Sequence, residues 1–310
     1  MPELSFITDL LAASIQAGTP LLLACLGEII TERSGNLNLG AEGMMLVGAM
    51  TGFATAYFTG SPVLGAIAGS LAGCGMSLIH AFLTVSLQAS QVVSGLGLTI
   101  FGIGLSGFLG VNLVGLKGPG FAKIPIPFLS DIPIIGPVFF NQDALVYVAL
   151  LLVPLTWYYL FRSRPGLSVR AVGENPSAAD AWGESVAKIR YIHVLMGGLL
   201  AGLAGAYLSL GYTHMWMENM VAGRGWIAVA LVIFGFWHPF KAAAGAFLFG
   251  GVGVLQLRVQ AAGAHIPSSL LVMLPYLLTV GVLILITMRQ RRSGSVDAPA
   301  ALGLPFRRGE

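Results

Sequence analysis

Residues 43–116 read GMMLVGAMTGFATAYFTGSPVLGAIAGSLAGCGMSLIHAFLTVSLQASQVVSGLGLTIFGIGLSGFLGVNLVGL, and their character determines the fold class. These 74 residues contain no Asp, Glu, Lys or Arg. A membrane-spanning helix takes about 20 apolar residues, so the stretch can cross a bilayer three times. We expect breaks at Gly60-Ser61-Pro62 and between Gln88 and Gln91, where turn-forming and polar residues interrupt the apolar runs. The stretch therefore predicts an all-α, polytopic transmembrane helix bundle.

The composition of the whole chain agrees with a membrane protein. Of its 310 residues, 9% are charged and 56% are hydrophobic, with a mean hydropathy of +0.84. A typical soluble domain has roughly 25% charged residues, so a water-soluble globule is excluded. At about 20 residues a crossing there is no room for a large soluble domain, and we expect one transmembrane domain over residues 1–310. The net charge of +3 does not indicate a nucleic-acid partner.

Further uncharged segments extend the bundle. Residues 225–240 and 242–257 are 16 residues each, which is short for a crossing, and they form either two short spans or a re-entrant hairpin. The chain is thus predicted to have about 8–10 membrane segments. The longer uncharged segments are Leu10–Gly27, Ala144–Phe161, Tyr191–Met217 and Ser268–Met288.

Small residues recur at helix-packing intervals within two of these segments. Gly65, Gly69 and Gly73 stand four residues apart, as do Gly198 and Gly202. Such spacing favours close contact between helix backbones in a membrane.

Basic residues orient the chain. Ten of the 16 Lys and Arg residues fall in two segments, 162–190 and the tail 289–310. Because cytoplasmic loops carry an excess of Lys and Arg, we place both segments in the cytoplasm and the N-terminus outside. We expect the basic tail to be disordered.

The polar segment 28–43 lies between two apolar spans. It holds three carboxylates, one Arg and two Asn residues. Such groups are costly in lipid, so the segment must face the bundle interior, a watery cavity or the cytoplasm, and its three glycines permit non-helical backbone. Two interpretations stay open: a broken helix that lines a pathway, or an ordinary loop in which Arg33 pairs with Glu32 or Glu28.

The cytoplasmic segment 170–183 carries the signals of a short helix. Asn175 suits the N-cap, Pro176 the first helical position and Gly183 the position after the last turn. A helix of about two turns in a cytoplasmic loop is suited to docking into a groove of a partner through Ala178, Ala179 and Trp182. The alternative is a lid that packs along the membrane surface.

A third polar segment, residues 218–226, is placed outside by the predicted topology. Its Arg224, flanked by two glycines, is suited to orient a substrate or to hold the outer mouth of a pathway. The alternative is an interfacial anchor whose Arg reaches to the membrane surface.

The sequence does not support catalysis. It has no Gly-x4-Gly-Lys-Ser/Thr loop for ATP and no His-Glu-x-x-His metal motif. Residues 102–107 match the dinucleotide fingerprint Gly-x-Gly-x-x-Gly, but they lie inside an uncharged span and do not follow a soluble strand. We therefore expect no catalytic residue and no metal site in this chain.

Several separated motifs resemble one family. The strings ITERSGNLNLGAEGMM at residues 30–45, RAVGENP at 170–176 and AGRGWIAVA at 222–230 occur in that order, followed by LFG at 248–250 and LPY at 274–276. Together they resemble the permeases of ABC importers for nucleosides and simple sugars, the ribose-type permeases of the branched-chain amino acid and sugar permease superfamily. The resemblance runs from about Gly27 to Leu285.

This resemblance implies an α-helical permease subunit of the bacterial-type cytoplasmic (inner) membrane. It implies three protein partners besides the lipid bilayer: an ATP-binding cassette protein on the cytoplasmic side, a second related permease, and an extracytoplasmic substrate-binding protein. ATP and Mg would bind in the cassette protein, so no cofactor is expected in this chain.

The resemblance also implies roles for individual residues. It places a substrate pathway at Asn36, Asn38, Glu42, Thr99 and Arg224. It makes the short cytoplasmic helix a coupling helix that comprises Glu174, Asn175, Pro176, Ala178, Ala179, Trp182 and Gly183. Thr99 departs from the family pattern, in which an amide residue is frequent, and residues 218–221 are a diverged version of the stretch before Ala222.

The versions ERSG at 32–35 and AGRG at 222–225 look most like the nucleoside branch, and ribose-like simple sugars are the alternative substrate. A rival from another class is an ion-coupled secondary transporter that uses Glu28, Glu32 or Glu42 as a proton or sodium site. An intramembrane hydrolase would need a paired nucleophile and base within the spans, and the sequence has none.

Overall fold

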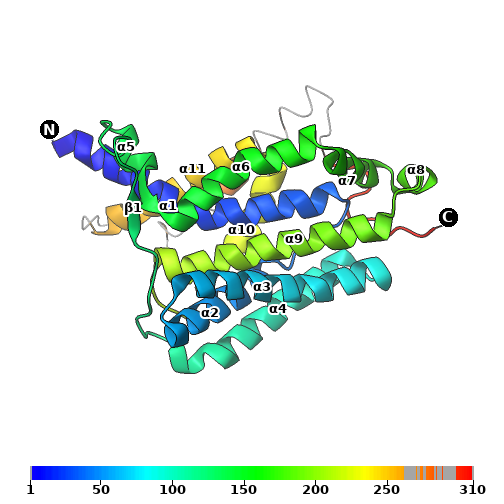
Figure 1. The fold of residues 1–310 in the computed structure, drawn as a ribbon, viewed down its shortest axis with the longest axis horizontal. Helices are drawn as coiled ribbons and strands as arrows, with labels where there is room; N and C mark the ends of the chain where they lie inside the picture. Colours follow the sequence, from blue (N-terminus) through cyan, green and yellow to red (C-terminus); the bar gives the residue numbers. More distant parts are fainter. Residues whose placement is uncertain are drawn as a thin grey trace.

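The computed structural model describes residues 2–261 and 298–308, together with positions 270, 273–274, 277–282, 284 and 288 between them. The described chain is a bundle of long helices that lie side by side (Figure 1). The helices are α1 (Pro2–Arg33), α2 (Ala41–Thr59), α3 (Pro62–Ala81), η1 (Phe82–Ser86), α4 (Gln91–Gly110), η2 (Val111–Leu113), α5 (Ile135–Phe139), α6 (Ala144–Arg162), α7 (Arg164–Glu174), α8 (Pro176–Ala181), α9 (Val186–Tyr207), η3 (Leu208–Tyr212), α10 (Arg224–Phe234) and α11 (Pro239–Ala261). The antiparallel strands β1 (Lys123–Pro125) and β2 (Asn141–Asp143) pair at one end.

The apolar segments predicted from the sequence form the expected helices. The breaks at Gly60-Ser61-Pro62 and before Gln91 separate α2, α3 and α4. Ser61 caps α3 by accepting a hydrogen bond from the backbone of Leu64, and Ser90 caps α4 in the same way. In the described part of the chain, six helices are long and apolar enough to cross a membrane: residues 6–33, 62–86, 91–113, 144–162, 186–212 and 239–261. The segment Ser268–Met288 lies outside the described residues apart from isolated positions.

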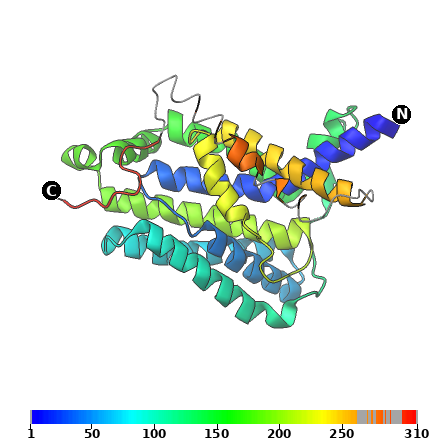
Figure 2. The same cartoon turned by 180° about the vertical axis from the view of Figure 1, so that it is seen from behind.

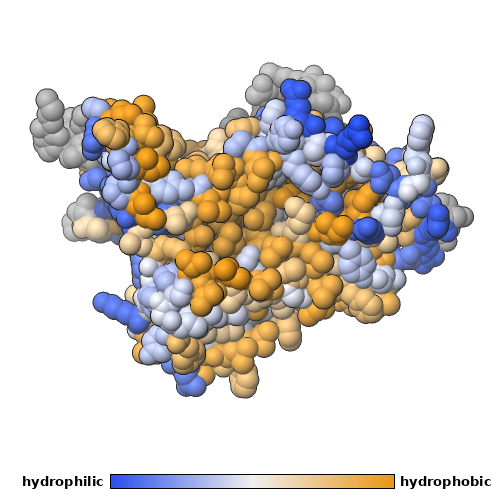
Figure 3. Space-filling model, in the orientation of Figure 1, coloured by the Kyte–Doolittle hydropathy of each residue, from blue (hydrophilic) through white to orange (hydrophobic). Residues whose placement is uncertain are grey.

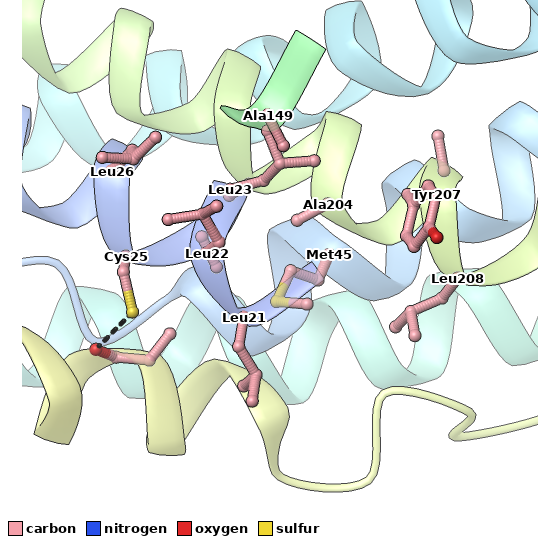
Figure 4. Close-up of a cluster of buried hydrophobic side chains, with 14 of the residues drawn as sticks. Leu21, Leu22, Leu23, Cys25, Leu26, Met45, Ala149, Ala204, Tyr207 and Leu208 are labelled. Atoms are coloured by element: carbon pink, nitrogen blue, oxygen red, sulfur yellow. Dashed lines mark hydrogen bonds between the residues drawn. The ribbon is translucent and has the colours of Figure 1, made fainter. Parts of the chain in front are cut away.

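Helix α1 is the centre of the core. Its apolar residues face neighbours on several sides, and Leu22, Leu23 and Leu26 are fully buried. Figure 4 shows Leu22 and Leu23 in one buried cluster with Met45 of α2 and Ala204 of α9. A helix that is apolar all round and buried in this way is a central element of the bundle.

Helices α2, α3 and α9 pack closely through glycines, as their spacing predicts. A Cβ atom on Gly202 of α9 would overlap the backbone carbonyl of Gly69 and the backbone of Gly73 in α3. One turn further along α9, a Cβ atom on Gly205 would overlap the carbonyl of Met45 in α2. Backbones this close gain van der Waals contact, which is a principal source of helix association where lipid is the solvent.

The two ends of the bundle differ in composition. Helices α7 and α8 lie at one end with the described C-terminal residues, whereas the N-terminus, α5 and the small sheet lie at the other (Figure 1). Apolar side chains cover the middle of the molecule, and polar ones gather mainly towards its ends (Figure 3). Because basic segments favour the cytoplasmic side, we expect the end that carries α7 and α8 to be the inner one, and it is called the inner end below.

Two predictions about the last third of the chain need correction. Neither of the two predicted alternatives, two short spans or a re-entrant hairpin, describes residues 225–257 as a whole: α10 has 11 residues and is about 16 Å long, whereas α11 has 23 residues and can span. Figure 2 shows the short α10 between the longer helices. The tail is not disordered throughout, because residues 298–308 follow a defined path with Pro299 and Ala301 buried.

The glycine contacts lead to a stability prediction. We expect Gly202→Ala to lower the unfolding free energy by about 1–3 kcal/mol, because the added methyl meets backbone atoms that cannot move aside. Gly104→Ala in α4 is the matched control, since its Cβ would meet no atom within 4 Å. Thermal unfolding in a mild detergent measures both variants. Equal midpoints for Gly202→Ala and Gly104→Ala would contradict the packing described.

Candidate functional site

The chain between α1 and α2 is an irregular segment inside the bundle. Residues 34–40 are not helical, and Ser34, Asn36 and Asn38 are fully buried. Gly35 begins the break with a φ of +87°, a conformation that favours glycine. Non-helical backbone at membrane depth needs hydrogen-bond partners from the protein itself. The geometry is that of a broken helix.

Side chains from α3, η1 and α4 supply these partners. The amide of Leu37 donates to Oε1 of Gln91 at 2.6 Å, and the hydroxyl of Thr99 donates to the carbonyl of Leu39 at 3.1 Å. The ring of His80 lies 3.1 Å from the carbonyl oxygen of Leu37. Asn36 donates through Nδ2 to the hydroxyl of Thr84 at 3.0 Å.

Asn38 connects the break to α1. Its Oδ1 accepts from the amide of Gly40 at 3.0 Å, and its Nδ2 donates to Oε1 of Glu28 at 2.7 Å. Three of the predicted pathway residues, Asn36, Asn38 and Thr99, therefore hold the broken backbone in place. His80, Thr84 and Gln91 were not among the predicted pathway residues, although polar side chains in an otherwise uncharged span are an available signal for such a role.

Glu42 joins the broken helix to α10. Its Oε1 accepts from the amide of Gly223 and its Oε2 from the amide of Gly225, both at 2.7 Å. These amides belong to the first turn of α10, where unpaired N–H groups and the helix dipole favour a negative group. One carboxylate thus satisfies two donors that would otherwise be buried in the bundle, and it brings the first and third polar segments of the sequence together.

The position of α10 corrects the prediction that Arg224 lies outside. Cys25 of α1 donates through Sγ to the carbonyl of Ala228 at 3.4 Å, as Figure 4 shows. Near the inner end of α1, Trp237 donates through Nε1 to the carboxylate of Glu32. Helix α10 therefore runs beside the inner half of α1, and Arg224 lies about half-way through the bundle. The chain re-enters the bundle before α10 because backbone donors there are bonded by Glu42.

Arg224 stabilises the re-entrant turn. Its Nη1 donates to the carbonyls of Met220 and Val221, at 3.0 and 3.1 Å. At the other end of α10, Nη2 of Arg33 lies 3.3 Å from the carbonyls of Phe236 and of Trp237 and donates to both. Both ends of this short helix are therefore held by charged side chains.

A cavity of about 280 Å³ lies at the start of α10, between α1 and α11. Of the five predicted pathway residues, Arg224 is the one that lines this cavity. Its other polar side chains, Gln256 and Tyr212, were not among the predicted pathway residues. Its apolar wall includes Leu21, Ile227 and Phe249. The full lining is Ala17, Leu21, Tyr212, Ala222, Arg224, Ile227, Phe249, Gly250, Gly253, Gln256 and Leu257.

The short cytoplasmic helix forms as its capping residues predict. Asn175 accepts through Oδ1 from the amide of Ala178 at 3.0 Å, Pro176 is the first residue of α8, and Gly183 follows with a φ of +91°. Glu174 ends α7 directly before it. Helix α8 projects from the inner end of the bundle (Figure 1).

The two faces of α8 differ. Ala179 is 5% exposed and packs with Val172 and Val186. Ala178 is exposed, and the side chain of Trp182 is 89% exposed. The predicted docking residues therefore divide into one anchor, Ala179, and two that are available to a partner.

Comparison with known proteins identifies the family. The family model described as "Branched-chain amino acid transport system / permease component" matches residues 10–286. The "Putative glucose ABC transporter permease protein TsgC13" of Haloferax volcanii is 48% identical over 261 residues, which cover 83% of this chain and 79% of that protein. The guanosine ABC transporter permease protein NupQ of Bacillus subtilis is 35% identical over 331 residues that cover both chains in full. The nucleoside ABC transporter permease protein NupC of Lactococcus lactis is 36% identical over 304 residues, 93% of each chain.

The matched range agrees with the motifs, which run from about Gly27 to Leu285 and predict an ABC importer permease. Its relatives are transport subunits rather than enzymes. The chain belongs to the permease component family of branched-chain amino acid transport systems.

Proposed function

We propose that this chain is the permease subunit of an ATP-driven importer and that it translocates nucleosides across a bacterial-type cytoplasmic membrane. A cassette protein would bind ATP and Mg on the inner side, a second related permease would complete the pathway, and an extracytoplasmic binding protein would deliver the ligand. The observation that carries the proposal is the cavity at the start of α10, half-way through the bundle.

The cavity suits a ligand with one flat apolar part and one hydroxyl-rich part. Phe249, Ile227 and Leu21 provide an apolar wall against which a nucleobase can pack. Gln256 and Arg224 provide a carboxamide and a guanidinium that can bond to ribose hydroxyls or base edges. Its volume of about 280 Å³ is at the lower limit of small-molecule sites, roughly 300–1,000 Å³. This size is consistent with a site to which a second permease contributes.

A simple sugar is the second candidate substrate, because the relative that is 48% identical carries a glucose permease name. Two observations favour a nucleoside. NupQ and NupC, which carry guanosine and nucleoside names, are matched over 93% or more of their length, and the cavity wall is more apolar than a bare sugar requires.

The contacts of α10 indicate how the site could alternate between two sides. Glu42 ties its start to α2, whereas Trp237 and Glu32 tie its end to α1. A movement of α1 against α2 therefore has to displace α10 and the cavity wall. ATP binding in the partner would bias such a two-state bundle through α8.

The carboxylates proposed for an ion-coupled transporter already have partners. Glu28 accepts from Asn38, Glu32 from Trp237 and Glu42 from two backbone amides. Both oxygens of Glu42 are used in this way, which favours a structural role for it over an ion site, whereas Oε2 of Glu28 and Oε1 of Glu32 have no hydrogen-bond partner among the described residues.

The test of the function is uptake by the complex purified from its native membrane in mild detergent and placed in liposomes. We expect a second permease and a cassette protein to copurify, and uptake of radiolabelled guanosine to need ATP inside and binding protein outside. Excess unlabelled nucleoside should compete, whereas glucose and ribose should not. Competition by sugars alone would select the second candidate, and uptake driven by an ion gradient without ATP would contradict the proposal.

A second prediction concerns Glu42. We expect Glu42→Gln to leave one amide of α10 without an acceptor, which costs about 1–3 kcal/mol, and to reduce uptake while the complex still assembles. The exposed Glu218→Gln is the matched control. Thermal midpoints and uptake rates are the measurements. An unchanged thermal midpoint and uptake rate in Glu42→Gln would show that Glu42 has no role in holding α10 or in transport.

A third prediction separates the two faces of α8. Ala178→Asp changes an exposed docking residue, so we expect ATP hydrolysis to continue while uptake per ATP falls. Ala187→Asp, exposed at the cytoplasmic start of α9, is the control. Ala179→Asp buries a charge among Val172 and Val186 and should instead destabilise α8 itself. An unchanged ratio of uptake to ATP hydrolysis in Ala178→Asp would contradict a docking role for Ala178.

A further inference from the structure

The C-terminal residues 298–308, here termed the clasp, form an ordered strap across the inner end of the bundle. Their backbone makes a series of turns with Ala301 only 5% exposed, and Gly303 has a φ of +79°. In Figures 1 and 2 the segment runs from the side of α7 past the inner end of α1. A basic and proline-containing tail would remain solvated unless specific contacts held it, so each contact is informative.

Two backbone hydrogen bonds connect the clasp to functional segments. The amide of Ala301 donates to the carbonyl of Gly173 at 2.9 Å, one turn before the coupling helix. The amide of Gly303 donates to the carbonyl of Gly35 at 3.1 Å, at the turn where the broken helix begins. The clasp therefore bridges the approach to α8 and the start of the break, which are 138 residues apart in sequence.

A buried arginine fastens the clasp to α9. The side chain of Arg190 is 2% exposed, and its Nη1 donates to the carbonyl of Leu304 at 3.0 Å. Its Nε and Nη2 have no hydrogen-bond partner among the described residues. Burying a guanidinium with few hydrogen-bond acceptors is energetically costly. The carbonyl of Leu304 in the clasp therefore lowers the cost of burying Arg190.

The clasp also contacts the underside of the coupling helix. Phe306 packs against the cluster of Val172, Ala179 and Val186, which includes the anchor residue of α8. Arg308 pairs with Asp180 at 3.0 Å, but its side chain is 82% exposed and the pair contributes little by itself.

On its other side, the clasp reaches the turn that follows η1. Gln88 donates through Nε2 to the carbonyl of Phe306 at 3.0 Å and accepts through Oε1 from Nε of Arg307 at 2.7 Å. The clasp thus touches α7, α8, α9, the break after α1 and the connection between η1 and α4.

We propose that the clasp transmits the movement of the coupling helix to the broken helix of the pathway. The six-residue α8 buries only Ala179, so it has little packing of its own through which to move the rest of the bundle. Through Phe306 on one side and Gly35 on the other, the clasp supplies that connection. This inference rests on the proposed function, in which α8 docks on an ATP-binding partner.

The first test is hydrogen exchange of the complete complex, which needs no knowledge of the substrate. We expect Phe306→Ala to speed exchange at the amides of residues 178–182 at least about tenfold, and also at Gly35 and Gly303. Leu304→Ala is the matched control, since that side chain is 55% exposed and the hydrogen bonds of Leu304 are made by its backbone. Gln88→Ala is a second variant that leaves the packing of α8 intact and should speed exchange in the clasp alone.

The second test is the number of substrate molecules transported per ATP hydrolysed in the same complexes. We expect a loss of at least about threefold in Phe306→Ala and none in Leu304→Ala. Unchanged exchange, or faster exchange with unchanged coupling, would overturn the proposal. If the unaltered complex did not transport nucleosides, the proposed substrate would be wrong, whereas the exchange result would still decide whether the clasp holds α8 and the break together.

Discussion

The hydrogen bonds from two backbone amides of α10 to the carboxylate of Glu42 are the interaction on which the candidate pathway depends. A helix that begins inside the bundle leaves donors that lipid cannot satisfy. Glu42 satisfies two of them and lies just after a break that itself needs partners. The two irregular segments, 34–40 and 213–223, are therefore compatible with the membrane only when they meet. The cavity at the start of α10 is a consequence of that meeting.

Several other polar groups in the bundle serve the same requirement. Asn38, Gln91 and Thr99 bond to backbone groups of the break, and Arg33 bonds to carbonyls at the end of α10. These side chains replace the backbone hydrogen bonds that a continuous helix would have made within itself. The bundle thus exchanges regular hydrogen bonds for a pair of irregular segments and a polar-lined space between them, which is the arrangement that transport across a bilayer requires.

The sequence predicted the parts of this structure that depend on local signals. Uncharged segments predicted the positions of α3, α4, α6 and α9. The capping residues Asn175, Pro176 and Gly183 predicted the position of α8. The end of α10 was not predictable in this way. Residues 225–240 stay uncharged beyond Phe234, and the chain that follows Gly235, the C-cap of α10, is held by bonds from Trp237 and the carbonyls beside it to Glu32 and Arg33, more than 200 positions away. The clasp was not predicted, because its backbone makes most of its hydrogen bonds to the bundle and Phe306 is a single apolar contact in a basic tail.

The most direct test of the proposed nucleoside site is to find where a nucleoside binds in the assembled transporter. Photocrosslinking of the purified complex with an azido-nucleoside, followed by peptide mapping, makes that measurement. We expect a label on residues around Arg224 and Gln256 whose formation is prevented by unlabelled guanosine and not by glucose. A label confined to other segments, or one prevented by glucose and not by guanosine, would contradict the proposed site.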